Sequence, residues 1–159
     1  MKEVKLGNSD KVAHVDDEDF ERVSQHKWTL STAGYVFRYI HLGTFDGKKV
    51  GRAEGLHRFI LSTGAEEIDH KNRNKLDYQK HNLRLCTRSQ NQANRGPKNG
   101  RRFKGTRRNG RVFQARIIVD KKLLYLGTFI AEEDAAKAYD KAAVEHFGEF
   151  ARLNFSAET

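Results

Sequence analysis

The chain contains Glu67-Ile68-Asp69-His70, then Asn82-Leu83-Arg84-Leu85-Cys86, and then Thr87-Arg88-Ser89-Gln90-Asn91. The first two segments are typical of short strands, and they are separated by a polar loop over residues 71–80. Thr87 and Gln90 have the spacing of a capping box, which predicts that a helix begins there and carries Asn91 on its first turn. We therefore expect two strands and a helix to bring Asp69, His70 and Asn91 to one point.

These side chains have the chemistry that hydrolysis of a phosphodiester with one metal ion requires. A histidine with an ordinary pKa titrates near neutrality, so His70 can be the general base that deprotonates water. Asp69 offers a carboxylate and Asn91 an amide oxygen, which are the hard ligands that divalent cations such as Mg²⁺ prefer. We expect a Mg²⁺ site at these two residues, with Mn²⁺ as the alternative metal. The competing interpretation is that an asparagine-rich loop only forms turns and that the Asp-His pair occurs by chance.

Residues 56 to 95 resemble the HNH (ββα-metal) nucleases, in the cysteine-free version found in phage and intron homing endonucleases. The resemblance implies that Asn82, at the position of the central asparagine of the motif, holds His70 in its productive orientation. Arg84 and Arg88 would clamp the scissile phosphate, or would simply be surface charges. His57 matches the first histidine of the pattern, for which we favour a structural or phosphate-contacting role.

The segments before this motif predict a β-rich module and a short helix. Residues 11–15 alternate like a strand, and the acidic run 16–19 is expected to cap a short helix rather than to bind metal. Residues 28–30 and 34–40 are typical of two strands, and Asp46-Gly47 indicates a hairpin turn. Residues 56–61 predict a helix with an apolar face formed by Leu56, Phe59 and Ile60. The module resembles, more weakly, the segment that precedes the nuclease motif in many phage HNH homing endonucleases.

The segment after the motif predicts a three-stranded sheet and a helix. Asn109-Gly110 is a type I′ hairpin signal, and Lys121-Lys122 marks the next turn. Phe113, Ala115 and Ile117 should point inward, with alternate residues on the other face. Residues 132–147 predict a helix with a stripe of small residues (Ala135, Ala138, Ala142 and Ala143), ended by Gly148.

Residues 103 to 155 resemble the plant ethylene-response-factor (APETALA-type) DNA-binding domain, which also occurs fused to phage HNH nucleases. The strings that carry the resemblance are residues 103–107, 113–117, 125–129, 133–140 and 153–155. It implies that Arg107, Gln114 and Arg116 face the major groove, where arginine reads guanine and glutamine reads adenine. Phosphate contacts are expected from the other cations of the segment, which are Arg101, Arg102, Arg108, Arg111, Lys121 and Lys122. Thr106, Phe113 and Tyr125 differ from the plant pattern, so the base preference of the plant domains is not carried over.

Composition favours a nucleic-acid partner. The chain has 30 Lys and Arg against 21 Asp and Glu, and residues 95–122 alone hold 11 basic residues and one acid. Such localised charge suits a phosphate backbone, although a solvated basic face would show it too. Cys86 is the only cysteine, which excludes an internal disulfide and a cysteine-rich zinc site and predicts a buried packing residue. No apolar run approaches a membrane span, so we expect a soluble protein of the cytoplasm. The resemblance to phage nucleases implies that the cell is bacterial or phage-infected.

These observations predict an α+β fold with a small β-rich module (1–50), a ββα-metal HNH core (51–95), a linker (96–102) and an APETALA-type domain (103–159) in which a three-stranded antiparallel sheet packs on one helix. The function that follows is a site-directed endonuclease of double-stranded DNA that uses one divalent cation. We expect a monomer, which would nick one strand, with a dimer as the alternative. Two other functions stay open: a DNA-binding regulator with a vestigial HNH core, and an RNA-processing nuclease.

Overall fold

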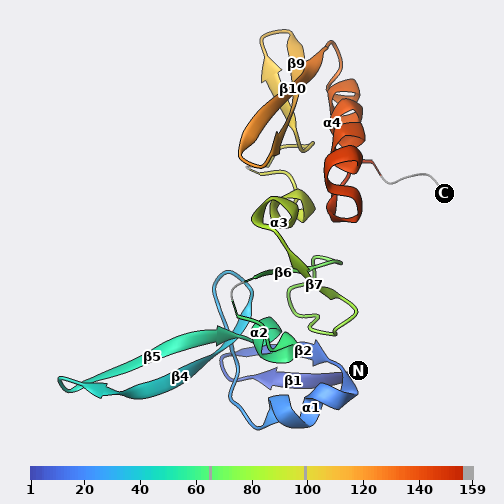
Figure 1. The fold of residues 1–159 in the computed structure, drawn as a ribbon. Coiled ribbons are helices and arrows are strands. Elements are labelled where there is room, and N and C mark those ends of the chain that lie inside the picture. The colour runs from blue at the N-terminus through green and yellow to red at the C-terminus, as the bar shows by residue number, and fades with distance from the viewer. Residues whose placement is uncertain (65, 99, 156–159) are drawn as a thin grey trace. The chain divides into compact units, whose positions relative to one another are not determined.

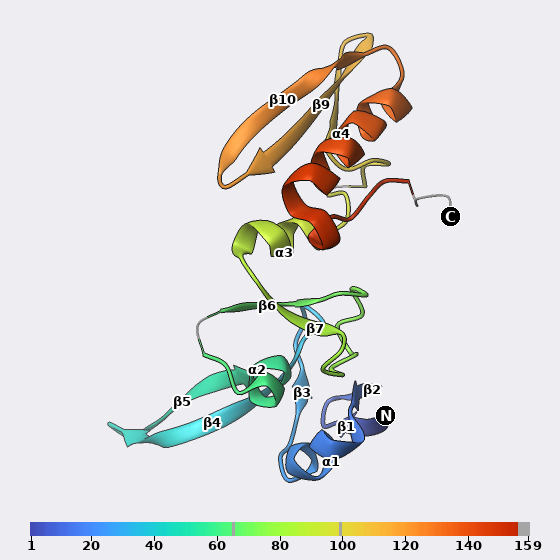
Figure 2. The same cartoon turned by 45° about the vertical axis from the view of Figure 1, so that its right-hand side comes forward.

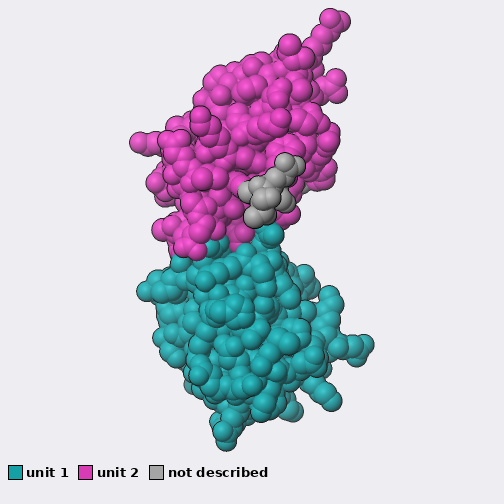
Figure 3. Space-filling model, turned by 90° about the vertical axis from the view of Figure 1, so that its right-hand side faces the viewer, with its two compact units in different colours: residues 1–85 teal, residues 86–159 magenta. Residues whose placement is uncertain are grey.

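The computed structural model describes residues 1–64, 66–98 and 100–155. The chain divides into two compact units, Met1–Leu85 and Cys86–Thr159 (Figure 3). Asn99, within the expected linker, lies outside the described residues. Among the helices of the described ranges, none has the length and apolar character needed to cross a bilayer.

The first unit begins with an antiparallel hairpin of β1 (Lys2–Leu6) and β2 (Ser9–Val15), followed by α1 (Asp17–Ser24) (Figure 1). Strand β2 confirms the predicted strand, whereas β1 was not predicted. The expected capping by the acidic run is only partly right. Asp16 occupies the N-cap position without a side-chain cap bond, and its carboxylate instead accepts hydrogen bonds from Lys80 N at 2.7 Å and Gln79 Nε2 at 3.1 Å. The acids of the first turn still favour the positive end of the helix.

A three-stranded sheet in the order β3-β4-β5 follows, formed by β3 (Thr29–Leu30), β4 (Val36–Phe45) and β5 (Lys48–Gly55). Asp46 and Gly47 form its turn with φ values of 49° and 71°. Positive φ at both central residues is the type I′ geometry, and the predicted hairpin is confirmed. Helix α2 (Leu56–Leu61) comes next, with Leu56 and Ile60 buried as expected.

The core of the first unit joins these elements. Trp28 is buried among them, and its indole Nε1 donates a hydrogen bond to Val23 O at 2.9 Å. The other large side chains that are fully buried are Tyr78, Leu56, Val15, Val23 and Val36. Tyr78 comes from the polar loop, which means that this loop is anchored in the core.

Strands β6 (Glu67–His70) and β7 (Leu83–Cys86) form a two-stranded sheet, as predicted. The loop between them pairs with β2: His14 N donates to Leu76 O at 2.7 Å, and Tyr78 N donates to His14 O at 2.8 Å. Because both bonds are to backbone atoms of a strand, the loop has a defined path. Cys86 is half-buried rather than buried.

The second unit comprises α3 (Arg88–Asn94), the sheet β10-β9-β8, α4 (Glu132–Phe147) and a 3₁₀ turn, η1 (Gly148–Phe150). The strands are β8 (Thr106–Asn109), β9 (Val112–Val119) and β10 (Lys122–Phe129), and α4 packs on one face of their sheet (Figures 1 and 2). A buried cluster joins Ile117 of the sheet to Tyr139, Ala142, Ala143 and Phe147 of α4 and to Ala93 of α3. The described residues thus form a mixed fold of small sheets and four α-helices, which is compatible with the predicted α+β class.

Several local predictions in this unit need correction. The turn between β8 and β9 has positive φ at Gly110 alone, which is the pattern of a type II′ rather than a type I′ turn. The next turn lies at Asp120 and Lys121, with φ values of 47° and 68°, and β10 already begins at Lys122. In α4 the bounds are as predicted, but Ala136 is buried where Ala138 was expected.

Candidate active site

The side chain of Asp69 makes a buried ion pair with Arg84 on the neighbouring strand. The Asp69 and Arg84 side chains are only 7% and 10% exposed, and Arg84 Nη2 lies 2.8 Å from Asp69 Oδ2. Arg84 Nε donates to the same oxygen at 3.0 Å. The structure therefore places Arg84 against the carboxylate, where it fixes the orientation of that group, and not on the surface.

His70 ends β6 inside a group of aromatic rings. Its ring centroid lies 5.1 Å from that of Tyr78, 6.1 Å from that of Tyr35 and 6.2 Å from that of His57. Tyr78 is itself held in place, because Val36 N donates to its Oη at 2.8 Å. The rings thus surround the imidazole of His70 on several sides and restrict its rotation.

Burial lowers the pKa of His70 to about 4, although the nearby Asp69 and Asp77 carboxylates act in the opposite direction. The sequence argument assumed an ordinary pKa, and the structure corrects that assumption. At neutral pH the imidazole is uncharged, so it can accept a proton.

His57 belongs to the same aromatic group, on α2. Its ring is stacked on that of Tyr78 at an interplanar angle of 7°. A Cβ at Gly55 would lie 2.6 Å from the His57 ring, so glycine is needed at position 55 for this packing. Burial, together with the neighbouring His70, lowers the pKa of His57 to about 4. We favoured a structural or a phosphate-contacting role for His57, and its buried surroundings agree with the structural one.

Asn82 is buried beneath the loop that follows His70. Its Oδ1 accepts a hydrogen bond from Asn72 N at 2.9 Å, and its Nδ2 donates to Asp77 O at 2.8 Å. Its backbone carbonyl accepts from Lys71 N at 2.8 Å. The side-chain amide thus joins Asn72 to Asp77 within the loop, and the backbone carbonyl holds Lys71, the residue directly after His70.

Sequence reasoning missed Tyr35, Tyr78 and Asp77 as neighbours of His70. Tyr78 had a weak signal, because Leu76 and Tyr78 are the apolar residues of an otherwise polar stretch. Tyr35 had none, because its place next to His70 depends on long-range folding. Among the described residues, no group of three or more His, Cys, Asp or Glu side chains is arranged so that it could hold a metal ion.

Asn91 and Arg88 lie on α3, in the second unit. This helix begins with the predicted capping box: Gln90 N donates to Thr87 Oγ1 at 3.2 Å, and Thr87 N donates to Gln90 Oε1 at 2.8 Å. Lys104 Nζ donates to Gln92 O at 3.1 Å and also to Ala93 O. Burial is the main reason that the pKa of Lys104 falls to about 8. These bonds attach α3 to the loop before β8.

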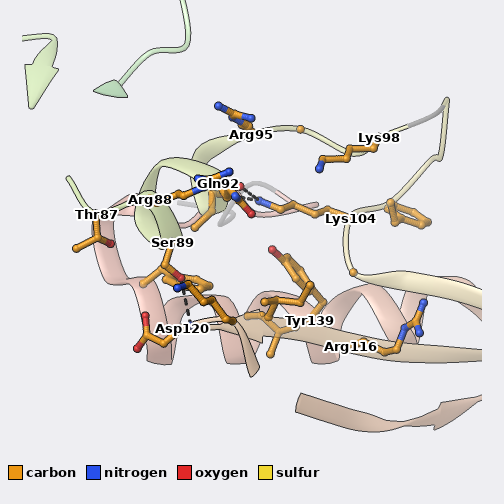
Figure 4. Close-up of a pocket in the computed structure, with 18 of the residues that line it drawn as sticks. Thr87, Arg88, Ser89, Gln92, Arg95, Lys98, Lys104, Arg116, Asp120 and Tyr139 are labelled. Atoms are coloured by element: carbon orange, nitrogen blue, oxygen red, sulfur yellow. Dashed lines mark hydrogen bonds between the residues drawn. The ribbon is translucent and has the colours of Figure 1, made fainter. Parts of the chain in front are cut away.

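A pocket of about 700 Å³ lies beside α3, and Figure 4 shows the side chains around it. Its lining includes the large side chains of Phe103, Ile117 and Tyr139. Gly105 is required there, because its φ is +79° and a Cβ would lie 1.9 Å from the Tyr139 ring. Among the described residues of the lining, Asp120 is the one acid, and the cations are Arg88, Arg95, Lys98, Arg101, Lys104, Arg116 and Lys121. A pocket with this charge suits an anionic ligand.

The sheet face away from α4 carries the residues expected to read bases. Arg107 pairs with Gln114 across β8 and β9, and Arg116 pairs with Tyr125 across β9 and β10. Ala115 and Ile117, the alternate residues of β9, are buried on the other face as predicted.

The other predicted phosphate contacts are dispersed. Arg108 pairs across the sheet with Phe113. Because Arg108 is the neighbour of Arg107 in β8, the two side chains lie on opposite faces of the sheet. Arg102 forms an exposed ion pair with Glu133 at 2.6 Å. Lys122 lies at the start of β10, and Arg111 lies in the exposed turn before β9.

Comparisons with known proteins agree with the motif. Residues 56–93 match a family model described as HNH endonuclease. An uncharacterized HNH endonuclease of Acanthamoeba polyphaga mimivirus is 32% identical over 140 residues, which cover 83% of this chain and 68% of that protein.

Two plant proteins are also similar. An ethylene-responsive transcription factor of Arabidopsis thaliana is 26% identical over 164 residues, which cover 86% of this chain and 37% of that protein. An AP2-like ethylene-responsive transcription factor of the same plant is 31% identical over 164 residues, which cover 86% of this chain and 29% of that protein. The chain therefore spans only about a third of the length of these two relatives.

Proposed function

Because this chain belongs to the HNH endonuclease family, we propose that it is a site-directed endonuclease of the homing type. It hydrolyses phosphodiester bonds of double-stranded DNA with one divalent cation per site. The observation that carries this proposal is the buried, uncharged imidazole of His70, held by aromatic rings next to the oriented carboxylate of Asp69.

His70 is the proposed general base. A neutral imidazole accepts a proton from water as that water attacks the phosphorus atom. The rings of Tyr78 and His57 restrict the imidazole of His70. Little orientational freedom of the imidazole therefore has to be given up when the reaction begins. Asn82 contributes through the loop. Its Oδ1 accepts a hydrogen bond from Asn72 N, which fixes the backbone directly after His70.

Asp69 and Asn91 are the proposed ligands of the cation, which we expect to be Mg²⁺ or Mn²⁺. The Asp69 carboxylate suits this role, because its orientation is fixed by Arg84 and carboxylate oxygens are hard ligands of the kind that such cations prefer. A bound cation would neutralise charge on the scissile phosphate and on the departing 3′ oxygen. Arg84 then orients the ligand, while Arg88 keeps its proposed role as a phosphate clamp.

The second unit is the proposed reader of DNA sequence, with an APETALA-type domain. Arg107, Gln114 and Arg116 share the open face of the sheet, as residues that contact base edges must. The cations around the pocket beside α3, other than Arg116, are suited to the phosphate backbone. A nuclease with little sequence preference is directed to its site when it is joined to such a reader.

A DNA-binding regulator with an inactive nuclease core is the second candidate function. The similarity to two plant transcription factors favours it. The retained set of Asp69, His70, Asn82 and Asn91 argues for the nuclease, since a protein that only binds DNA needs none of them at these positions.

Relaxation of supercoiled plasmid tests the proposal. DNA from the genomic neighbourhood of the gene is cloned into the plasmid, and the protein is added with Mg²⁺, with Mn²⁺ or with EDTA. We expect open-circle DNA with a metal and none with EDTA. Tight binding to the same DNA with no product in either metal would establish the regulator instead.

A further inference from the structure

The loop between β6 and β7 carries the backbone that follows His70, and Asn82 is bonded to both of its ends. Lys71 N donates to Asn82 O at 2.8 Å, and Asn72 N donates to Asn82 Oδ1 at 2.9 Å. At the other end of the loop, Asn82 N donates to Gln79 O at 2.9 Å. The position of Gln79 therefore affects that of Asn82 and, through Asn82, that of the residues directly after His70.

Elements from the start of the chain hold this loop. Figures 1 and 2 show that it reaches β2, where His14 bonds to the backbone of Leu76 and of Tyr78. The hydroxyl of Tyr78 is bonded to Val36 N at 2.8 Å. Ordering a polar loop costs conformational entropy at each residue, so bonds to a strand are needed to keep it in one conformation.

Asp16, the residue directly after β2, holds the part of the loop that leads into Asn82. Its Oδ2 accepts a hydrogen bond from Lys80 N at 2.7 Å, and its Oδ1 accepts one from Gln79 Nε2 at 3.1 Å. Hydrogen bonds to an ionised carboxylate are about twice as strong as those between neutral groups. The two oxygens of one carboxylate thus fix two consecutive residues of the loop.

The carboxylate of Asp16 serves the loop instead of its own helix. An aspartate at the N-cap position ordinarily accepts a hydrogen bond from a backbone N–H of the first helical turn. Asp16 is the N-cap residue of α1, yet within the described residues its side chain makes no such bond. The side chain of Lys80 is directed to the same helix, since its Nζ lies 3.1 Å from Asp19 Oδ2 and also pairs with Glu18. A side chain that gives up its local role for a distant contact indicates a function for that contact.

We propose that Asp16 is a positioning residue for the nuclease reaction, which fixes the end of the loop at Asn82 and thereby the backbone that carries His70. This inference rests on the proposed function, in that His70 is the general base. The β1-β2 hairpin then takes part in the reaction, although it lies outside the residues that match the HNH family. Misplacement of a catalytic group by about 1 Å can lower a rate by roughly 10²-fold, so a loose loop should slow cleavage.

Single-turnover cleavage by the full-length protein, in saturating excess over the DNA, tests this role. The DNA is the plasmid with the genomic neighbourhood of the gene, and the variants are Asp16→Ala, Asp16→Asn and Gln79→Met. Asp10→Ala is the matched control, because Asp10 is an exposed acid of β2. DNA affinity in EDTA and urea unfolding of each protein are measured beside the rate, so that loss of binding or of folded protein is recognised.

We expect Asp16→Ala to lower the cleavage rate at least about ten-fold, with DNA affinity and the Mg²⁺ concentration for half-maximal rate changed less than about two-fold. The Mg²⁺ dependence should stay the same because neither proposed ligand lies in the loop. Asp16→Asn keeps an oxygen that can accept from Lys80 N, so its rate should stay within about three-fold of the wild type. Gln79→Met removes one of the two bonds and should lower the rate less than Asp16→Ala. Added to Asp16→Ala, it should lower the rate no further, because both changes break the same contact.

A wild-type rate in Asp16→Ala would overturn this inference and leave the proposed function standing. An equal loss in Asp16→Asn and Asp16→Ala would also overturn it, because charge rather than the bonds to the loop would then be responsible. A rate that falls only in proportion to the folded fraction would give Asp16 a purely structural role. If Asp16→Ala does not fold, an unchanged rate in Gln79→Met is the contradicting result. Wild-type protein that binds this DNA and cleaves none of it would overturn the proposed function as well.

Discussion

The pair of Asp69 and Arg84 is the residue-scale feature on which the proposed metal site depends. Both side chains are removed from water, so each charge needs the other to offset the cost of burial. Sequence reasoning could propose Asp69 as a ligand from the motif. It could not place Arg84, because the depth of a side chain in a strand depends on what covers that strand.

Replacement of Arg84 by methionine should destabilise the first unit strongly. The change leaves the Asp69 carboxylate buried without its cation, which typically costs 3–5 kcal/mol, as a rough guide. Urea unfolding followed by fluorescence of Trp28, the single tryptophan of the chain, measures the free energy of unfolding. Arg88→Met, an exposed position, is the control and should cost less than about 0.5 kcal/mol. A loss below about 1 kcal/mol in Arg84→Met, together with weaker DNA binding, would favour the phosphate clamp.

The stability of the first unit should fall as the pH drops from about 6.5 to about 4. Burial lowers the pKa values of His57 and His70 to about 4, so below the ordinary histidine pKa the unfolded chain binds protons that the folded chain does not. Each histidine should lower the free energy of unfolding by on the order of 2 kcal/mol at pH 5 relative to pH 7.5. Trp28 fluorescence in urea at several pH values measures this loss. His57→Gln should remove about half of the pH dependence, and a wild-type stability that stays constant down to pH 5 would contradict the account.

At the scale of elements, α3 is the helix whose position matters most for the proposed chemistry. It carries Asn91, and it is held within the second unit by Lys104, by Ala93 in the buried cluster and by a bond from Arg152 N to Ala93 O at 3.2 Å. Lys104 is thus a positioning residue for Asn91, and its contribution acts through the carbonyls at the end of the helix.

Lys104→Met should raise the concentration of divalent cation needed for half-maximal cleavage at least three-fold. The substitution removes the donors to Gln92 O and Ala93 O, so that α3 no longer holds Asn91 in one place. Titration of plasmid cleavage with Mg²⁺ gives this concentration. Lys98→Met is the matched control, because Lys98 lines the same pocket and is exposed. The same Mg²⁺ dependence in both variants would show that Lys104 does not position Asn91.

Elements with strong local signals could be predicted from the sequence. The capping box of Thr87 and Gln90 located the start of α3, and the period of small residues located α4 with its observed bounds. The Asp46-Gly47 turn was also found, because only a few residue types adopt positive φ without strain.

Features that depend on distant parts of the chain could not be predicted. Strand β1 has little pattern of its own and forms by pairing with β2. The polar loop was expected to be only a loop, whereas its backbone pairs with His14 and its Tyr78 fills the core. The ring group around His70 follows from this packing, which no local spacing encodes.

At the scale of the whole molecule, the proposed general base and the strongly basic stretch lie in different units. His70 and Asp69 belong to the first unit, and the strongly basic stretch 95–122 belongs to the second. The proposed function requires a reader and a nuclease in one chain, so variants of each should affect different measurements.

Substitution of Arg107 and Gln114 by alanine should relax sequence preference. These side chains are proposed to contact base edges, where an arginine contact contributes about 1–3 kcal/mol of discrimination. Selection of bound sequences from a random duplex library measures that preference. Lys121→Ala with Lys122→Ala should instead weaken binding to all sequences equally. It should also lower the slope of log affinity against log salt concentration by about 2. A preference unchanged in the Arg107 and Gln114 variant would contradict the assignment of this sheet face as the reader.

The most direct test of the central claim compares the wild type with His70→Ala in a single-turnover cleavage assay, with the protein in saturating excess over the DNA. Affinity for the same DNA is measured in EDTA, and His81→Ala, an exposed histidine of the same unit, serves as the control. We predict that His70→Ala lowers the cleavage rate by roughly 10²- to 10⁴-fold, as loss of a general base does, while affinity changes less than two-fold. Cleavage by His70→Ala at the wild-type rate would contradict the account.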